Sequence, residues 1–242
     1  DEHLAAHVGD RAHEIAHEVV ALDLVDADAV LDRDGHARIV ACGVHHGLDA
    51  LGANSRGDGA GRCVNELSHD FPAFRLGGLG DVVGALPKYQ NKLGHVAKVV
   101  MPAYSTKFLY ENEFEVVYDG WVRLGYDNLQ VRIFREKTNK LGFDLFLVHI
   151  SGLLDREKVY GYDDDTERFL AFQIASLDWI AQWEHQPSVI HCHDHHTGLI
   201  PFMMTQCYQF DSLKMIPTVF TIHNAQYQGW FSHNHIEWVP KF

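Results

Sequence analysis

A glycine-rich turn stands directly before a helical pattern near residue 80. The segment Arg75–Val83 reads RLGGLGDVV and carries three glycines ahead of the apolar run Val82–Leu86. Glycine lets a backbone approach an anion closely, and the free N–H groups at the start of a helix attract negative charge. Arg75 would add charge-assisted hydrogen bonds. The turn therefore predicts a phosphate site, and a purely structural turn is the alternative.

Two better-known nucleotide motifs do not fit this turn. No Gly-Lys-Ser/Thr follows it, which excludes a Walker A loop. The spacing of Gly78, Gly80 and Gly84 only approximates a dinucleotide fingerprint, and the following apolar run ends in Met101-Pro102 without a ribose-binding acid. A nicotinamide-dependent oxidoreductase is therefore disfavoured.

A second cluster of reactive side chains is the segment His191–His196, which reads HCHDHH. Imidazole and thiolate groups are ligands of transition metals. On a strand, however, His191 and His193 face one side and Cys192 faces the other, so the ligands do not converge without a turn. A metal site, a cluster satisfied by its own contacts and a substrate-facing strand end all stay open. The last is favoured, because parallel sheets bind ligands at the carboxyl ends of their strands.

A third pattern is the literal H-E-x-x-H of His13–His17. Two histidines four residues apart share one helix face, and with Glu14 as the base this is the spacing of zinc peptidases. No Glu occurs between Glu18 and Glu66 to serve as a third ligand, and eight histidines in the first 70 residues make a chance match easy. A solvated His-rich helix is favoured, and a zinc peptidase is kept as an alternative.

The composition limits the class of protein. The chain has 242 residues, 46% of them hydrophobic, which suffices for a packed core, and its net charge of −13 argues against nucleic acid as a partner. No apolar run approaches the roughly 18 residues of a membrane span, and the acidic start lacks the order of a signal peptide. The four cysteines form no C-x-x-C pair, which favours reduced thiols. We therefore expect a cytoplasmic protein without a membrane partner.

A sharp change in composition falls near residue 70. The first 70 residues hold 14 Asp and Glu against 5 Lys and Arg, and they contain no aromatic residue and no Lys. Such a segment offers little apolar area to bury. We expect residues 1–62 to be an unassigned extension that is dispensable to the fold of the rest. Residues 63–242 then form the domain, with Cys63–Leu67 as its first strand.

The elements that position these motifs alternate between strands and helices. One helix is predicted within Thr166–Glu184, where apolar residues recur three and four positions apart. The predicted strands, taken as a parallel series, are Val96–Met101, Leu129–Arg135, Phe143–Ile150, Val189–His193 and Thr218–His223. This alternation predicts an α/β fold with a doubly wound, Rossmann-like parallel sheet.

Four segments in this order resemble motifs of the glycogen and starch synthases, glycosyltransferase family 5. Arg75–Lys88 is similar to the opening K-x-G-G-L-x-D-V, and Asp164–Phe169 to D-N-x-x-R-F. His191–Leu199 resembles H-x-H-D-W-H-x-G-L, and Thr221–Gly229 resembles V-H-N-x-x-Y-Q-G. The resemblance covers about residues 67–242 and implies the N-terminal half of a GT-B fold, whose active site lies between two Rossmann-like domains.

The resemblance also implies a reaction, the transfer of glucose from ADP-glucose or UDP-glucose to the non-reducing end of an α-1,4-glucan with retention. It implies no metal or other cofactor, and it implies that the chain is inactive without a C-terminal Rossmann-like domain. A noncatalytic glucan-binding fragment is the alternative. The residues carried over are Arg75, Gly77, Gly78 and Leu79 for the donor diphosphate, His196 and Asp164 for the transferred glucose, and Asn224 and Tyr227 for the cleft-side loop.

Three positions depart from the family pattern. Arg75 stands where the family has lysine, which keeps the charge but changes its geometry. His195 replaces a tryptophan, and Asp165 replaces an asparagine. The departures fall within the motifs expected to meet the substrate.

Overall fold

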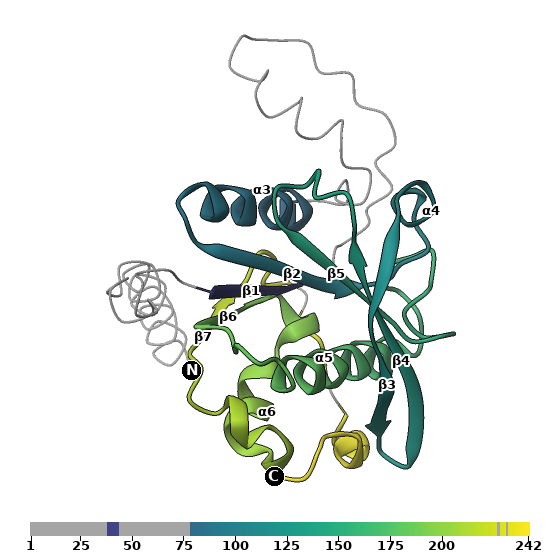
Figure 1. Ribbon diagram of the computed structural model, residues 1–242. Coiled ribbons are helices and arrows are strands. Elements are labelled where there is room, and N and C mark those ends of the chain that lie inside the picture. The colour runs from purple at the N-terminus through teal and green to yellow at the C-terminus, as the bar shows by residue number, and fades with distance from the viewer. Residues whose placement is uncertain (1–37, 44–77, 227, 231) are drawn as a thin grey trace, which may run out of the picture.

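The computed structural model describes residues 38–43, 78–226, 228–230 and 232–242, which form a seven-stranded sheet with helices on both faces (Figure 1). The strand order is β3-β4-β5-β2-β1-β6-β7. Five neighbouring strands are parallel: β5 (Asp144–His149), β2 (Val96–Pro102), β1 (Arg38–Gly43), β6 (Val189–His193) and β7 (Thr218–Thr221). The predicted α/β class and Rossmann-like sheet are confirmed.

The central strands are apolar because both faces of the sheet are covered. Val99, Val100, Leu145 and Ile190 are fully buried. A parallel strand that packs against helices on both sides needs such a continuous apolar run rather than an alternating one. These buried strands fix the positions of the loops that follow their carboxyl ends.

Helices cover the two faces unequally. α3 (Gly78–Lys92) lies on one face, and α5 (Asp165–Ala181) and α6 (Ile200–Gln206) lie on the other (Figure 1). α5 is the helix predicted from the apolar spacing, and Leu170, Ile174, Leu177 and Ile180 are buried along it. Shorter helical segments are α4 (Lys107–Glu111), η4 (His195–Thr197), η5 (Tyr208–Leu213) and η6 (His233–Trp238). Within the described ranges no helix combines the length and the apolarity needed to cross a membrane.

The sheet is mixed rather than wholly parallel, which corrects one expectation. The predicted strand 129–135 lies in β4 (Asp127–Glu136), which pairs antiparallel with both β5 and β3 (Phe114–Leu124). A two-residue turn at Gly125 and Tyr126 joins β3 to β4, and so short a connection permits only antiparallel strands. Exposure alternates along β4, as expected of a strand with one solvated face.

The strand between β2 and β6 is β1, and it comes from a part of the chain expected to lie outside the domain. Ile39 pairs with Ala97 on one side and Val189 on the other, so the expectation that residues 1–62 are separate from the fold does not hold for Arg38–Gly43. The physical reason is the run Ile39–Cys42, an uninterrupted apolar stretch that suits a central parallel strand. Cys63–Leu67, the strand expected there, lies outside the described residues.

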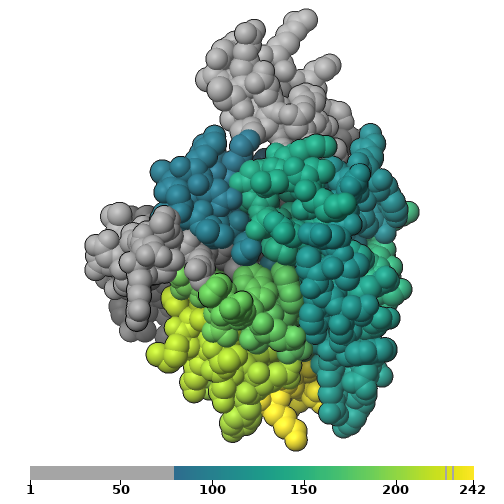
Figure 2. All heavy atoms as spheres, viewed as in Figure 1, coloured from purple at the N-terminus to yellow at the C-terminus, as the bar shows by residue number. Residues whose placement is uncertain are grey.

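The C-terminal segment returns to the antiparallel hairpin. In Figure 2 these yellow residues lie at the lower end of the molecule beside the teal hairpin. Trp238 packs against the turn at Gly125, where an added Cβ would meet its Cδ1 at 2.9 Å. This contact fixes the tip of β3 and β4 to the end of the chain.

Candidate functional site

The candidate site lies where the chain reverses its direction of travel through the sheet. From β1 the chain proceeds to β2 and then to β5 on one side, whereas β6 and β7 follow on the other. Gly43 at the end of β1 pairs with His193 at the end of β6. Open α/β sheets bind ligands outside the carboxyl ends of their strands at such a switch point.

Asp194 joins the two loops that leave β6 and β7. Its Oδ1 accepts hydrogen bonds from the backbone N–H of His223 at 2.7 Å and of Asn224 at 3.3 Å, and its own N–H donates to the Thr221 carbonyl at 2.9 Å. The residue is buried, and its φ of 58° and ψ of 178° lie in a region that non-glycine residues rarely adopt. Backbone strain of this kind is common at ligand sites, where the surroundings hold it in place.

The predicted histidine cluster forms stacked pairs. The rings of His191 and His193 lie 4.1 Å apart, and His193 Nδ1 is 2.9 Å from Nε2 of His223. His191 Nε2 hydrogen bonds with the Thr221 hydroxyl at 2.7 Å. Within the described residues no group of three or more His, Cys, Asp or Glu side chains is arranged to hold a metal ion. The geometry agrees with a strand end whose histidines interact with one another and with β7.

His195 and His196 differ in where they point. Their rings are 3.7 Å apart, and His196 also meets the ring of Phe169 edge-on at 4.5 Å. His196 is fully buried, whereas His195 lines a cleft beside α5. Of the two, the residue that replaces the family tryptophan is therefore the one in contact with the cleft.

The cleft has a volume of about 820 Å³ and opens between α5 and the loop that follows β7. Asp165 and Thr166 line it from the first turn of α5, and Gln226 and Trp230 line it from the loop. Gly229 packs directly on His195, because an added Cβ would lie 2.4 Å from His195 Cδ2. The walls combine apolar surface with a few polar groups, as is usual for small-ligand sites.

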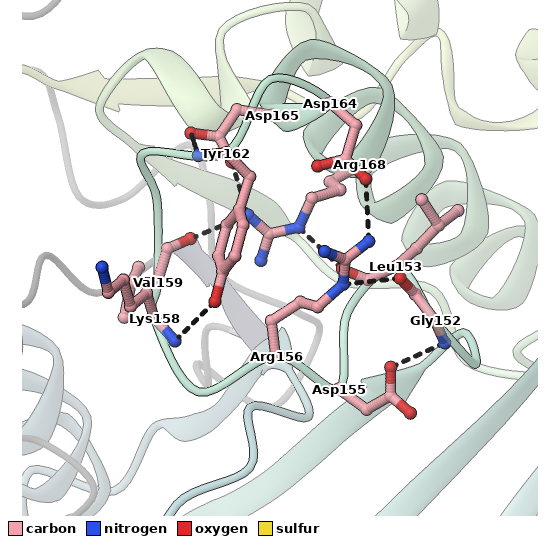
Figure 3. A network of polar contacts seen from close by, with 10 residues as sticks. All are labelled: Gly152, Leu153, Asp155, Arg156, Lys158, Val159, Tyr162, Asp164, Asp165 and Arg168. Atoms are coloured by element: carbon pink, nitrogen blue, oxygen red, sulfur yellow. Dashed lines mark hydrogen bonds and ion pairs between the residues drawn. The ribbon is translucent and has the colours of Figure 1, made fainter.

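Asp164 stands at the N-cap position of α5, beside this cleft. It is partly exposed and is not among the residues that line the cleft. Its Oδ2 accepts a hydrogen bond from Arg156 NH2 at 2.8 Å (Figure 3). Burial, followed by the charge of Asp164, raises the pKa of the neighbouring Glu167 above its usual value. The start of α5 thus carries neighbouring carboxylates, and one of them, Asp164, is paired with Arg156.

The predicted phosphate turn is described only in part. α3 begins at Gly78, four residues before the predicted helical run at Val82, so Gly78 and Gly80 lie in its first turn rather than in a turn before it. The side chain of Leu79 is buried in the core, which leaves only its backbone N–H for a ligand. Arg75 and Gly77 lie outside the described residues. A helix is present as predicted, but it starts within the glycine segment, and the phosphate contacts of Arg75, Gly77 and Gly78 stay a prediction.

The loop after β7 contains the remaining predicted residues. Asn224 is exposed, and its Oδ1 accepts a hydrogen bond from the Gln226 N–H at 3.0 Å, so part of the loop is held by its own contacts. Tyr227 lies outside the described residues, as does the H-E-x-x-H segment at His13, Glu14 and His17. The structure thus brings the histidine motif and the loop together but leaves these side chains untested.

Comparison with known proteins supplies the family. Residues 67–241 match the family model described as the starch synthase catalytic domain. The chain belongs to this family. It is 52% identical over 172 residues to the glycogen synthase of Flavobacterium johnsoniae, a match that covers 71% of this chain and 36% of the relative. It is 37% identical over 169 residues to the glycogen synthase of Clostridium kluyveri, covering 69% and 35%.

The fold of the starch synthase family is seen in a solved structure as well. The catalytic domain of Starch Synthase IV from Arabidopsis thaliana superimposes with a TM-score of 0.65 at 21% identity, over 85% of this chain and 37% of that one. This likeness concerns the fold and supports the N-terminal half of a GT-B architecture. The chain spans about a third of the length of the curated relatives that it matches.

Three residues of the site were not singled out from the sequence. Asp194 and Gly229 fall inside the quoted motifs, but their roles depend on a backbone conformation and a close approach that spacing does not encode. Arg156 lies in the loop before α5, and its contact with Asp164 exists only once that loop has folded. A charged residue eight positions before the Asp164 carboxylate was the only signal available.

Proposed function

We propose that this chain is the N-terminal half of the catalytic unit of a glycogen or starch synthase. In that role it takes part in transferring glucose from ADP-glucose or UDP-glucose to the non-reducing end of an α-1,4-glucan, with retention of configuration. The observation that carries the proposal is the meeting of two family motifs, His191–Leu199 and Thr221–Gly229, around one cleft beside the start of α5. This is the edge of the sheet at which parallel α/β folds bind ligands.

The chemistry of the donor fits the start of α3. The Arabidopsis Starch Synthase IV domain was solved with ADP and acarbose, which supports a nucleotide-sugar donor and a glucan acceptor for this chain. The proposed diphosphate ligands are Arg75, the backbone of Gly77 and Gly78, and the N–H of Leu79. A helix start presents unpaired N–H groups and a positive dipole end to such an anion.

The proposed catalytic term is electrostatic. Negative charge develops on the departing diphosphate and positive charge on the sugar, and preorganised donors and charges stabilise both. Backbone N–H groups serve the phosphate, while Asp164 and His196 act near the glucose. His196 is buried and packs against His195, which lines the cleft. We therefore propose that His196 acts on the sugar together with His195. In this scheme protein cations neutralise the diphosphate, and neither a metal nor another cofactor is used.

The proposal includes a partner domain. A GT-B active site lies between two Rossmann-like halves. The relatives are about three times as long as the part that this chain matches, and we propose that the second half is a C-terminal domain of the same protein. One face of a cleft binds a ligand weakly, so the isolated chain is expected to bind ADP poorly and to transfer little glucose. We place the enzyme in the cytoplasm, where buried reduced thiols such as Cys192 and Cys207 are usual.

The experiment is a paired measurement of ADP affinity and glucose transfer in the full-length protein. Gly78→Val is expected to abolish ADP binding, because a branched side chain fills the space of the phosphate and restricts the backbone. Arg75→Lys is expected to do far less, since the charge is kept. A folded Gly78→Val protein with normal ADP affinity and transfer would contradict the donor site.

A third variant separates the sugar from the phosphate. His196→Ala is expected to lower turnover more than ADP affinity. The melting temperatures of His196→Ala and of His195→Ala are compared to detect any loss of packing. Glucan binding without either ADP binding or transfer would instead identify a noncatalytic glucan-binding fragment. Near one zinc per chain, lost in His13→Ala and His17→Ala, would support the zinc peptidase.

A further inference from the structure

Two neighbouring carboxylates at the start of α5 are each paired with an arginine, but they differ in how many of their oxygens are occupied. Asp165 uses both: Oδ1 is bonded to Arg168 NH1, and Oδ2 accepts from the N–H groups of Gly161 and Tyr162. Asp164 uses one, the Oδ2 bonded to Arg156 NH2 at 2.8 Å. No other group in the described ranges donates to the Asp164 carboxylate, although the Asp164 carbonyl accepts from the Arg168 N–H at 3.0 Å. Asp165 is thus a structural carboxylate, whereas Asp164 has an oxygen left for a ligand.

Arg156 is itself held at several points. Its carbonyl accepts a hydrogen bond from the Ser105 N–H at 3.1 Å, which ties its backbone to the loop after β2. Its Nε donates to the Gly152 carbonyl at 2.6 Å, and its guanidinium lies 5.1 Å from the ring centre of Tyr162 (Figure 3). The orientation of NH2 toward Asp164 is therefore fixed before any ligand arrives.

The ring of Tyr162 is fixed in turn. Its hydroxyl accepts a hydrogen bond from the Lys158 N–H at 3.1 Å, and its N–H donates to Asp165 Oδ2 at 3.2 Å. The guanidinium of Arg168, which is fully buried, lies 4.7 Å from the ring centre. Both guanidinium groups thus lie over the ring of one tyrosine. The loop between β5 and α5 is therefore held by contacts among its own residues and with the start of α5.

From this geometry we propose that Arg156 is a positioning residue for Asp164. It holds Oδ2 and leaves Oδ1 available to a sugar bound beside the cleft, and it does not itself contact the substrate. Each side chain is about one-third exposed, at 32% for Arg156 and 30% for Asp164, so their attraction is screened by water and adds little stability. Orientation is the larger effect, because a displacement of about 1 Å in a reacting group costs on the order of 100-fold in rate. This inference rests on the proposed role of Asp164 in glucose transfer.

The test is a double-mutant cycle in the full-length protein with Arg156→Gln, Asp164→Asn and the double variant. Each single change is expected to lower kcat, roughly 10- to 100-fold for Arg156→Gln, while ADP affinity is retained. In the Asp164→Asn background, Arg156→Gln should lower kcat by no more than about twofold, because its partner is already disabled. Arg156→Lys should stay below wild type, since an ammonium cannot reach Gly152 and Asp164 with the same fork.

The matched control is Arg135→Gln. Arg135 NH2 donates to Asp144 Oδ1 at 2.9 Å, an equivalent pair at the amino end of β5, away from the site. This variant should keep wild-type kcat, and melting temperatures of all variants report any change in folding.

The outcomes separate the two proposals. Wild-type kcat in Arg156→Gln, or equal losses in both backgrounds, would overturn the positioning role while the role of Asp164 stands. Wild-type kcat in Asp164→Asn would overturn both. Absence of glucose transfer in the unmodified full-length protein would instead reject the proposed function itself.

Discussion

The Oδ1 atom of Asp194 lies 2.7 Å from the backbone nitrogen of His223, and this bond ties the end of β6 to the loop after β7. The backbone of Asp194 is held at φ 58° and ψ 178°, which costs a non-glycine residue about 1–3 kcal/mol. Such a conformation persists only where surrounding contacts outweigh its cost. The two amides bound by the carboxylate provide these contacts, so the strain and the loop geometry depend on one side chain.

Asp194→Ala should therefore loosen the loop after β7. The N–H groups of His223 and Asn224 lose their acceptor, and because both hydrogen bonds are only partly buried, the loss should lie near the lower end of the about 1–3 kcal/mol that an unsatisfied buried donor costs. Asp194→Asn keeps an amide oxygen at the same place and should destabilise less. Thermal unfolding and hydrogen exchange at the two amides measure the difference. Identical melting and exchange in Ala and Asn variants would show that the carboxylate does not hold the loop.

Gly229→Ala should displace His195 and lower glucose transfer. The new Cβ would lie 2.4 Å from the imidazole, and the φ of +61° adds strain of about 1–2 kcal/mol. Gly142→Ala is the matched control, because its φ of +77° carries similar strain, while the atom nearest the added Cβ, Lys88 Cγ, lies at an ordinary contact distance of 3.4 Å. Activity assays and melting curves of both variants separate clash from strain. Equal effects in the two variants would rule out the clash.

The sequence predicted some parts of this site and not others for physical reasons. The strand Val189–His193 and the helix from Asp165 were predictable because their apolar periodicity is local. β4 was predicted in part, as Leu129–Arg135, but its hairpin partner β3 was not, because most of its residues are exposed or only partly buried. β1 was missed because an acidic, aromatic-free background masked its six residues. Pairs such as Arg156 and Asp164 depend on loop closure, which no short-range pattern encodes.

Acid should destabilise the fold partly through Asp144. Burial alone would raise its pKa, but the hydrogen bonds and charges of Lys98 and Arg135 outweigh burial and hold the pKa below its usual 3.8. A lowered folded-state pKa contributes stability above the unfolded value, and that stability is lost as pH falls below about 4. Asp144→Asn should lower the free energy of unfolding at pH 7 by roughly 1 kcal/mol, and the variant should lose less stability than wild type on acidification. Parallel pH curves for both proteins would contradict this assignment.

The last prediction concerns β1 and reverses the expectation that residues 1–62 are dispensable. Val40 pairs with Lys98 of β2 and Ile190 of β6, so its backbone lies in the middle of the sheet. Val40→Pro removes an N–H and introduces a ring into a strand with neighbours on both sides, which should cost about 3 kcal/mol or more.

The matched control for Val40→Pro is Val117→Pro in the edge strand β3. Val117 lies at a register shift between Val116 and Tyr118 and has no cross-strand counterpart, and proline is tolerated at such bulges. Urea unfolding followed by circular dichroism should show a large loss of stability for Val40→Pro and a small one for Val117→Pro. If both variants unfolded at the wild-type midpoint, Arg38–Gly43 would not be a working strand of this sheet. In the part of this segment that the structure describes, pairing with β2 and β6 is what joins it to the fold, so that result would support the original expectation for residues 1–62.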